Sequence, residues 1–498
     1  MMTSNQIVSK AWKLCGVLRN SGVSYSDYLE QITFLLFLKM ADEYSKPPYN
    51  RNIGIPNEFT WGTLVSKKGA DLENHYNKLL KDLSYEPGMI GQIFLKARNE
   101  IQKPAQLAKL ISMINDAEWV SLDADIKGDI YESILEKNAE DTKSGAGQYF
   151  TPRALIKAMI ECLRPEPKKT IADPACGTGG FFLGAYDFIV NNHKDLDKEE
   201  KEFLKLKTFR GNEIVSSTRR LCLMNLLLHN IGDISLESEI ISSQDALIPD
   251  LKEKVDYVFA NPPFGNNSSM TITNKQDEAE SEDLSYNRQD FWVTTSNKQL
   301  NFVQHIRTLL KSTGKSAVVV PDNVLFEGKA GETVRQKLLE TTDLHTILRL
   351  PTGIFYAKGV RANVIFFDNK PGAKDPWTKE VWIYDYRTNI HKTLKQNPLK
   401  FEDFADFIKC YNPENRHKRS ATWSEESPNG RWRKYSYDEI IARDKCSLDI
   451  FWLKDDSLTN LENLPEPQVL AEEIFLGLKS ATERFEKVLA QLSDGVGR

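Results

Sequence analysis

The feature that most constrains the fold is a short apolar run that leads into a glycine-rich turn and then into an apolar helical stretch. The run covers residues 170–173, and the turn after it reads Pro174-Ala175-Cys176-Gly177-Thr178-Gly179-Gly180. In a doubly wound sheet such a turn lies at the carboxyl end of a strand, where ligands bind. The pattern therefore predicts an open α/β sheet with a ligand site at this turn.

The residues after 170 support that fold, because short apolar runs alternate there with helical patterns, as in a parallel sheet with crossover helices. We expect strands near 170–175, 208–213, 255–260, 315–320, 345–350 and 362–367, with a less marked one near 237–242. A long polar stretch, 265–298, interrupts this order. It is interpreted either as a lid or substrate-facing loop or as a disordered insertion.

The chain has 498 residues, which is too long for one core, so several domains are expected. Residues 1–140 show helical periodicity and are predicted to form a helical domain, followed by the sheet domain at 141–400 and a polar extension at 401–465. A final helix at 466–498 begins at a proline break. It carries one apolar stripe: Leu470, Ile474, Leu478, Ala481, Phe485, Val488 and Leu492. The stripe is typical of a helix that docks on a partner or packs on its own domain, and its place behind the proline break favours docking on a partner.

Bulk properties exclude several classes of protein. The six cysteines form no C-x-x-C pair, which argues against a structural zinc site and a disulfide framework, and no metal site is expected. No apolar stretch approaches the roughly 18–20 residues that span a bilayer, and no secretory signal is visible. We therefore expect a cytoplasmic protein without membrane contact.

The chemistry of the turn favours S-adenosylmethionine over a dinucleotide. The third glycine of a dinucleotide motif would stand where the chain has Phe182. Asp173, just before the turn, can attract the cationic methionine end of the cofactor. Glu213 ends the next strand and can accept hydrogen bonds from both ribose hydroxyls. Asp245 ends a further strand, and either binding of the adenine amino group or capping of a helix is open to it.

A loop upstream of this turn ends in Gln148-Tyr149-Phe150-Thr151-Pro152-Arg153. Thr151 followed by Pro152 suits a helix cap and a first helical position. Because the loop precedes the glycine-rich turn, we favour closure over bound cofactor.

The tetrapeptide Asn261-Pro262-Pro263-Phe264 follows a buried strand and should reach the same sheet edge. The prolines withhold two amide donors, which leaves nearby carbonyls as acceptors. If the Asn261 oxygen and the Pro262 carbonyl accept both hydrogens of an exocyclic amine, its nitrogen regains nucleophilicity as a methyl group arrives. Phe264 offers a face on which a flipped base could stack. These residues predict methyl transfer to a nucleobase amine, with adenine N6 in DNA favoured.

These motifs, in this order, resemble the modification subunit of type I restriction-modification systems, the HsdM family of N6-adenine DNA methyltransferases. The resemblance implies that the loop residues 148–153, Ala175, Gly177 and Glu213, together with Thr178, Gly179 and Gly180, contact the cofactor. It also implies double-stranded DNA as substrate and a complex of two such subunits with a specificity subunit and an optional restriction subunit. A net charge of −5 agrees with this, since a chain that held DNA alone would carry a basic excess.

Three alternatives stay open from the residues. A self-sufficient DNA methyltransferase would need its own base-reading module, for which the residues after 400 look too short and too helical. A protein glutamine methyltransferase could use the same tetrapeptide on a planar amide. A non-catalytic assembly protein would require loss of cofactor binding.

Overall fold

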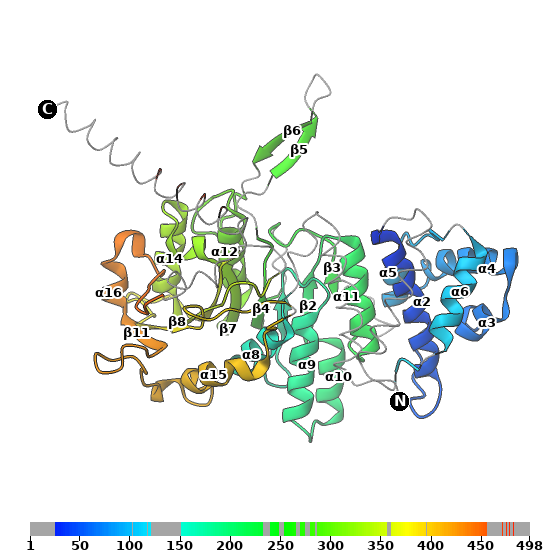
Figure 1. Ribbon diagram of the computed structural model, residues 1–498, viewed down its shortest axis with the longest axis horizontal. Helices are drawn as coiled ribbons and strands as arrows, with labels where there is room; N and C mark the ends of the chain where they lie inside the picture. The colour runs from blue at the N-terminus through cyan, green and yellow to red at the C-terminus, as the bar shows by residue number, and fades with distance from the viewer. Residues whose placement is uncertain are drawn as a thin grey trace.

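The computed structural model describes residues 25–101, 103–116, 118–120, 151–232, 240–248, 253–264, 269–273, 279–283, 286–355, 360–394 and 396–455, with residues 471, 475, 478 and 482. The expected loop residues Gln148, Tyr149 and Phe150 lie outside this part of the chain. Figure 1 shows a helical group at one end, a central sheet with helices on both faces, and a small hairpin standing away from them.

The sheet has nine strands in the described residues, in the order β11-β10-β8-β9-β7-β4-β1-β2-β3. Their bounds are β1 Ile171–Asp173, β2 Phe209–Asn212, β3 Ile241–Ser242, β4 Val255–Ala260, β7 Leu310–Pro321, β8 Thr342–Arg349, β9 Ala362–Asn369, β10 Glu380–Asp385 and β11 Trp432–Ser436. β9 runs antiparallel to β7 and β8, and β11 runs antiparallel to β10. The predicted α/β sheet is confirmed.

The strand order reverses between β1 and β4. β1 pairs in parallel with β2 on one side and with β4 on the other, with Ala172 opposite Val258. At such a switch point the loops after the two strands leave in opposite directions and open a crevice at the carboxyl ends. The glycine-rich turn follows β1 and the tetrapeptide follows β4, so both lie at this crevice.

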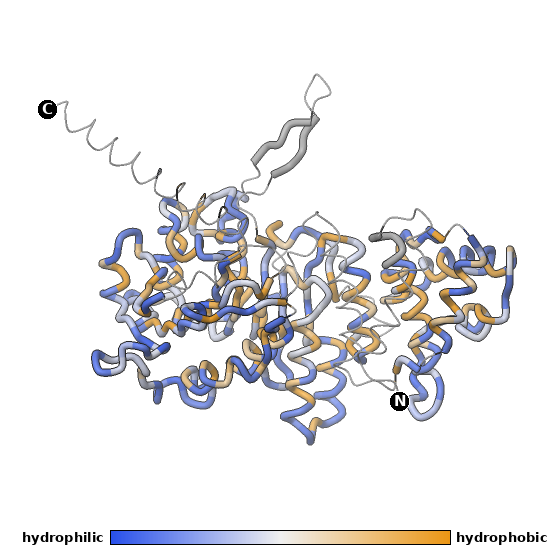
Figure 2. The backbone as a smooth tube through the Cα atoms, in the orientation of Figure 1, coloured by the Kyte–Doolittle hydropathy of each residue, from blue (hydrophilic) through white to orange (hydrophobic). Residues whose placement is uncertain are grey.

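Helices cover both faces of the sheet, because alternate residues of each strand point to opposite sides. In β4, Tyr257 and Phe259 join the core on one face, and Val258 and Ala260 join the core on the other. The sheet domain's helices are α8 Arg153–Leu163, α9 Gly180–Asn192, α10 Lys198–Leu206, α11 Ser216–Leu228, α12 Lys298–Leu309, α13 Asp322–Phe326, α14 Ala330–Thr341, α15 Ala405–Tyr411 and α16 Tyr437–Ile441. Apolar segments concentrate in the sheet and its helices, with hydrophilic segments in the outer loops (Figure 2).

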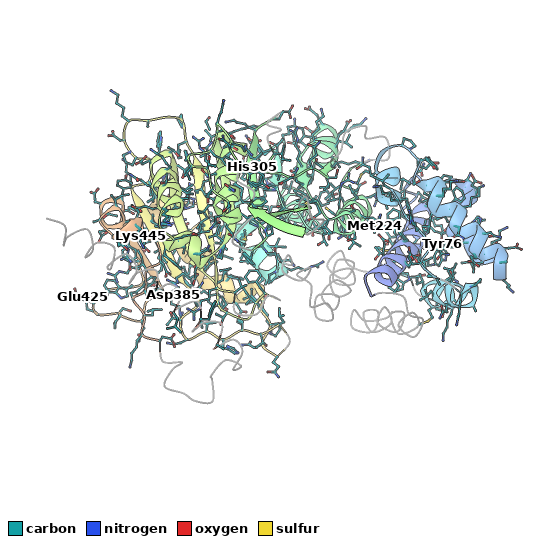
Figure 3. All side chains as sticks on the ribbon, turned by 90° about the horizontal axis from the view of Figure 1, so that it is seen from above. Tyr76, Met224, His305, Asp385, Glu425 and Lys445 are labelled. Atoms are coloured by element: carbon teal, nitrogen blue, oxygen red, sulfur yellow. The ribbon has the colours of Figure 1, made fainter. Side chains whose placement is uncertain are left out.

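The N-terminal helices form a separate group that packs on α11. They are α2 Tyr25–Ser45, α3 Trp61–Ser66, α4 Gly69–Leu83, α5 Gly88–Phe94 and α6 Pro104–Asn115. Met224 of α11 lies at the boundary with this group, whereas Tyr76 lies within it (Figure 3). Arg220 of α11 donates from Nε to the Ile93 carbonyl at 2.7 Å and from Nη2 to the Leu95 carbonyl at 2.9 Å. Buried hydrogen bonds thus join the helical group to the sheet.

Two features differ from the sequence-based expectations, and one agrees with them in the residues described. The helical interpretation of the residues after 400 missed β11, which joins the sheet beside β10, itself not predicted. The polar stretch after Phe264 contains a two-stranded antiparallel hairpin, β5 Ser269–Thr273 and β6 Ala279–Asp283, where only a loop was expected. Of the expected final helix, the described residues 471, 475, 478 and 482 are helical, and Phe475 and Leu478 are exposed.

Within the described residues, no helix is both long enough and apolar enough to cross a membrane.

Candidate active site

The glycine-rich turn is held in a conformation that favours glycine at two positions. Gly177 has φ 55° and Gly179 has φ 85°, both in the left-handed region. A Cβ on Gly179 would also lie 2.9 Å from Cys222 Sγ on α11, and one on Gly180 would lie 2.8 Å from Ile156 Cδ1 on α8. At Gly179 and Gly180 the turn therefore passes so close to α11 and α8 that a side chain would clash. The sequence pattern identified it correctly as a turn that opens a helix.

Asp173, the last residue of β1, has a nearly inaccessible carboxyl group. The residue is 2% exposed, and its Oδ1 accepts a hydrogen bond from the Ala175 amide at 3.0 Å. Burial, opposed by this bond and assisted by the charge of Glu213, raises the pKa of Asp173 to about 8. The carboxyl group is therefore largely protonated at neutral pH, and a nearby cation would favour its ionisation.

Glu213 lies directly after β2, the neighbour of β1. Its Oε2 accepts from the Gly177 amide at 3.1 Å and its Oε1 from the Val215 amide at 2.8 Å. Burial raises the pKa of this carboxyl group, although these backbone bonds favour the charged form. Glu213 is thus attached to the glycine-rich turn itself. Beside it Ile214 is 62% exposed, an apolar side chain that could cover a flat ligand and that the sequence analysis did not single out.

Asp245 follows β3 and makes two contacts. Its Oδ1 accepts from the Leu247 amide at 2.9 Å within a turn, and its Oδ2 accepts from the Tyr286 hydroxyl at 2.6 Å. No α-helix begins in this described segment, so the helix-cap interpretation of Asp245 is wrong in that form. Tyr286 was not predicted. Like Ala175, it packs against a small buried apolar cluster that includes Phe291, and no motif or spacing pointed to it.

Asn261, the first residue after β4, is 5% exposed. Its Nδ2 donates to Thr151 Oγ1 at 2.9 Å. Its Oδ1 is buried without a hydrogen-bond partner among the described residues. An unsatisfied buried acceptor costs about 1–3 kcal/mol, so such a group calls for an explanation. A substrate that donates a hydrogen here would satisfy it.

The remaining residues of the tetrapeptide shape the wall beside Asn261. Pro262 is buried, and Pro263 and Phe264 are half-buried. The Phe264 ring meets the Phe355 ring edge-on, with centroids 5.7 Å apart and planes at 86°. Phe355, which the sequence analysis missed, therefore sets the plane of the ring that was expected to stack on a base.

Thr151, Pro152 and Arg153 lie at the start of α8. The helix begins at Arg153, with Pro152 at the N-cap position and no side-chain cap. The alternative interpretation of Thr151 as the helix cap is wrong, because Pro152 holds the N-cap position. The Thr151 hydroxyl oxygen accepts from Asn261 instead. Thr178 contributes its carbonyl oxygen, which accepts from Asn225 Nδ2 of α11 at 3.1 Å. The structure thus brings the residues on both sides of β1 and β4 to one edge of the sheet.

The chain is similar to known proteins over nearly its whole length. The HsdM N-terminal domain matches residues 7–114, and the N-6 DNA Methylase family matches residues 122–446. The type I restriction enzyme StySPI methylase subunit of Salmonella potsdam is 38% identical, with 99% of this chain and 96% of that protein covered. The EcoKI methylase subunit of Escherichia coli strain K12 is also 38% identical, with the same coverage.

Solved structures agree with these matches. The crystal structure of the type I restriction enzyme EcoKI M protein aligns with a TM-score of 0.53 at 34% identity, covering 98% of this chain and 96% of that one. The type I methyltransferase subunit from Streptococcus thermophilus aligns with a TM-score of 0.67 at 19% identity, covering 90% and 98%, which is a likeness of fold. On the extent of these matches, the chain belongs to the N-6 DNA methylase family.

Proposed function

We propose that this chain transfers a methyl group from S-adenosylmethionine to adenine N6 in duplex DNA, as the modification subunit of a type I restriction-modification complex. The observation that carries the proposal is the buried Oδ1 of Asn261 at the switch point of the sheet, which has no hydrogen-bond partner among the described residues. This oxygen can accept a hydrogen bond, and an exocyclic amine can donate one. The family match favours a DNA base over a protein amide as the target.

The residues around the glycine-rich turn fit S-adenosylmethionine. Asp173 and Glu213 both have pKa values raised by burial, so a cation and hydroxyl donors would each relieve an unfavourable carboxylate environment. In the turn between them, Gly177, Gly179 and Gly180 carry no side chain, which lets a ligand approach the backbone closely. We propose that Asp173 faces the methionine end, Glu213 the ribose, and Asp245 the adenine, with residues 148–153 closing the site. When bound, the cofactor supplies an electrophilic methyl group on a sulfonium sulfur.

The chain's own residues would act on the target amine. The lone pair of an aromatic amine is delocalised into the ring, so its nitrogen is a poor nucleophile. Asn261 Oδ1 and the Pro262 carbonyl accept its hydrogens and favour tetrahedral nitrogen, which localises the lone pair for attack. The rigid prolines keep these acceptors in place. Phe264, braced by Phe355, would hold the flipped base by stacking, worth roughly 1–3 kcal/mol.

A partner that reads the sequence is part of the proposal. The net charge of −5 provides no overall basic excess to neutralise phosphates. The curated relatives are subunits of type I restriction enzymes by name. We propose that the helical domain at 1–140, the catalytic domain at 141–400, the extension at 401–465 and the helix at 466–498 assemble as two copies on a specificity subunit, and that the complex acts in the cytoplasm.

The test is transfer of labelled methyl groups to DNA by this chain co-purified with a specificity subunit from the same genome. We expect labelled N6-methyladenine with the complex and none with the chain alone. Asn261→Ala should leave only a small residual rate of transfer but keep cofactor binding, measured by calorimetry. A native rate of transfer in Asn261→Ala, or transfer to protein and not to DNA, would refute the proposal.

A further inference from the structure

The hydrogen bond between Thr151 and Asn261 joins two segments that are 110 residues apart in the sequence. We propose that Thr151 is a positioning residue for methyl transfer, whose hydroxyl holds the Asn261 amide with its oxygen toward the target amine. The inference rests on the proposed function. It gives Thr151 a role in the chemical step, in addition to its place in the segment 148–153 that is proposed to close the site.

The orientation of the amide follows from what each neighbour can donate or accept. An asparagine amide presents an oxygen acceptor on one side and an NH2 donor on the other. An exocyclic amine with two hydrogens must meet the oxygen, because the flipped amide would place N–H against N–H. In the productive orientation the NH2 group needs its own acceptor away from the substrate. Thr151 Oγ1, 2.9 Å from Nδ2, is that acceptor.

The surroundings leave the pair little freedom to find other partners. Thr151 is 8% exposed and Asn261 5% exposed, so water has little access to either side chain. Without the Thr151 oxygen, the Nδ2 group would lose its recorded acceptor while Oδ1 already lacks a donor. An amide with both ends unsatisfied has no reason to keep one orientation over the flipped one.

The backbone on both sides of this contact is rigid. Asn261 stands between the buried strand β4 and two prolines. Thr151 precedes Pro152, the N-cap residue of α8. The Pro152 carbonyl accepts from the Leu155 and Ile156 amides at 2.9 and 3.0 Å. α8 is itself buried along most of its length. Thr151 is therefore a fixed reference point for the Asn261 side chain.

The test uses the assembled complex with DNA and compares Thr151→Val with Thr151→Ser. Valine keeps the shape and removes the acceptor, whereas serine keeps the hydroxyl. For Thr151→Val we expect the single-turnover methylation rate to fall by about 10- to 100-fold, because misplacement of a catalytic group costs this much. The cofactor Kd and the DNA KM should change by less than about threefold, because an interaction that orients a catalytic group affects the chemical step more than binding. Thr151→Ser should recover most of the rate.

A matched control is Thr342→Val. Thr342 is also buried, and its hydroxyl donates to the Leu338 carbonyl at 2.6 Å, at the start of β8 and away from the site. This variant should lose some stability but keep the rate per folded complex. Thermal unfolding of every variant separates loss of fold from loss of rate.

A double-mutant comparison gives the second readout. If Thr151 acts through Asn261, adding Thr151→Val to Asn261→Ala should change the residual rate by less than about twofold, since the two losses are not independent. A normal rate in Thr151→Val, a loss explained wholly by weaker cofactor binding, or no recovery with serine would overturn the inference. If the native complex does not methylate adenine at all, the proposed function fails and this inference fails with it.

Discussion

If the carboxyl group of Asp173 faces the cationic end of the cofactor, as proposed, the affinity for cofactor should depend on pH. With a pKa of about 8 in the free protein, this group is ionised in only a small fraction of molecules at neutral pH. A cationic ligand binds the ionised form, so below the pKa its apparent affinity should rise about tenfold per pH unit. We therefore expect the Kd for S-adenosylmethionine to fall by about tenfold between pH 6 and pH 7 on the same basis.

The raised pKa of Asp173 has the opposite effect on stability: the free protein should become less stable as pH rises, whereas cofactor affinity should increase. The folded pKa of Asp173 lies above the ordinary value of 3.8, so the folded state retains a proton that the unfolded state releases. This contribution to stability is complete below about pH 4 and is lost as pH rises to about 8. Bound cofactor should reduce the loss, because its cation favours the carboxylate.

The assay is isothermal titration calorimetry of the purified chain between pH 5.5 and 7.5, in buffers of different ionisation enthalpy to count released protons. Asp173→Asn is the matched variant, because asparagine is close in shape and cannot ionise. Its Kd should depend less steeply on pH than that of the native chain by about one proton. Equal slopes in the two proteins, or no proton release by the native chain, would refute the argument.

Three further substitutions test the packing and electrostatics of the fold that supports the site. Gly179→Ala should lower the free energy of unfolding by roughly 2 kcal/mol or more in urea titrations, because φ is 85° and the new Cβ meets Cys222 Sγ. Arg220→Ala should lower the free energy of unfolding by roughly 2–5 kcal/mol and increase proteolysis between the helical group and the sheet, because one buried and one partly buried carbonyl lose their donor. Burial and the charge of Arg416 lower the pKa of His345 to about 3, so stability should fall as pH decreases from about 6.5. In His345→Gln the slope of unfolding free energy against pH between 4.5 and 6.5 should be smaller by about one proton, and an unchanged slope would contradict this.

The sequence predicted the parts of the site that depend on local pattern. The turn after Asp173 and the tetrapeptide at Asn261 each follow a short apolar run. A strand followed by a turn can be predicted from residue type and spacing within the segment itself. Their meeting at one edge follows from parallel pairing of β1 and β4. No comparable local pattern marks Tyr286, whose contact with Asp245 joins residues 41 apart through tertiary packing alone.

The missed strand β11 shows the same limit in the fold. Its sequence Trp432–Ser436 carries Arg433 and Lys434, so it lacks the apolar run that identified the inner strands. As the outer strand of the sheet it pairs with β10 alone, and charged residues are usual at such an edge. Pairing with β10 holds this segment in an extended conformation. The five residues of β11 alone do not indicate which strand they will pair with.

The unpartnered Asn261 oxygen implies a trade between stability and activity that can be measured. The pair is buried, and one acceptor in it is left unsatisfied in the free protein at a cost of about 1–3 kcal/mol. Replacing both polar partners by apolar residues of similar shape removes this cost, so the double variant Asn261→Leu/Thr151→Val should be at least as stable as the native chain in urea titrations while inactive. Asn261→Leu alone should be less favourable, since it leaves the Thr151 hydroxyl without the amide. If the double variant is less stable than either single variant, the buried amide stabilises the fold. The unsatisfied oxygen then does not lower stability in favour of activity.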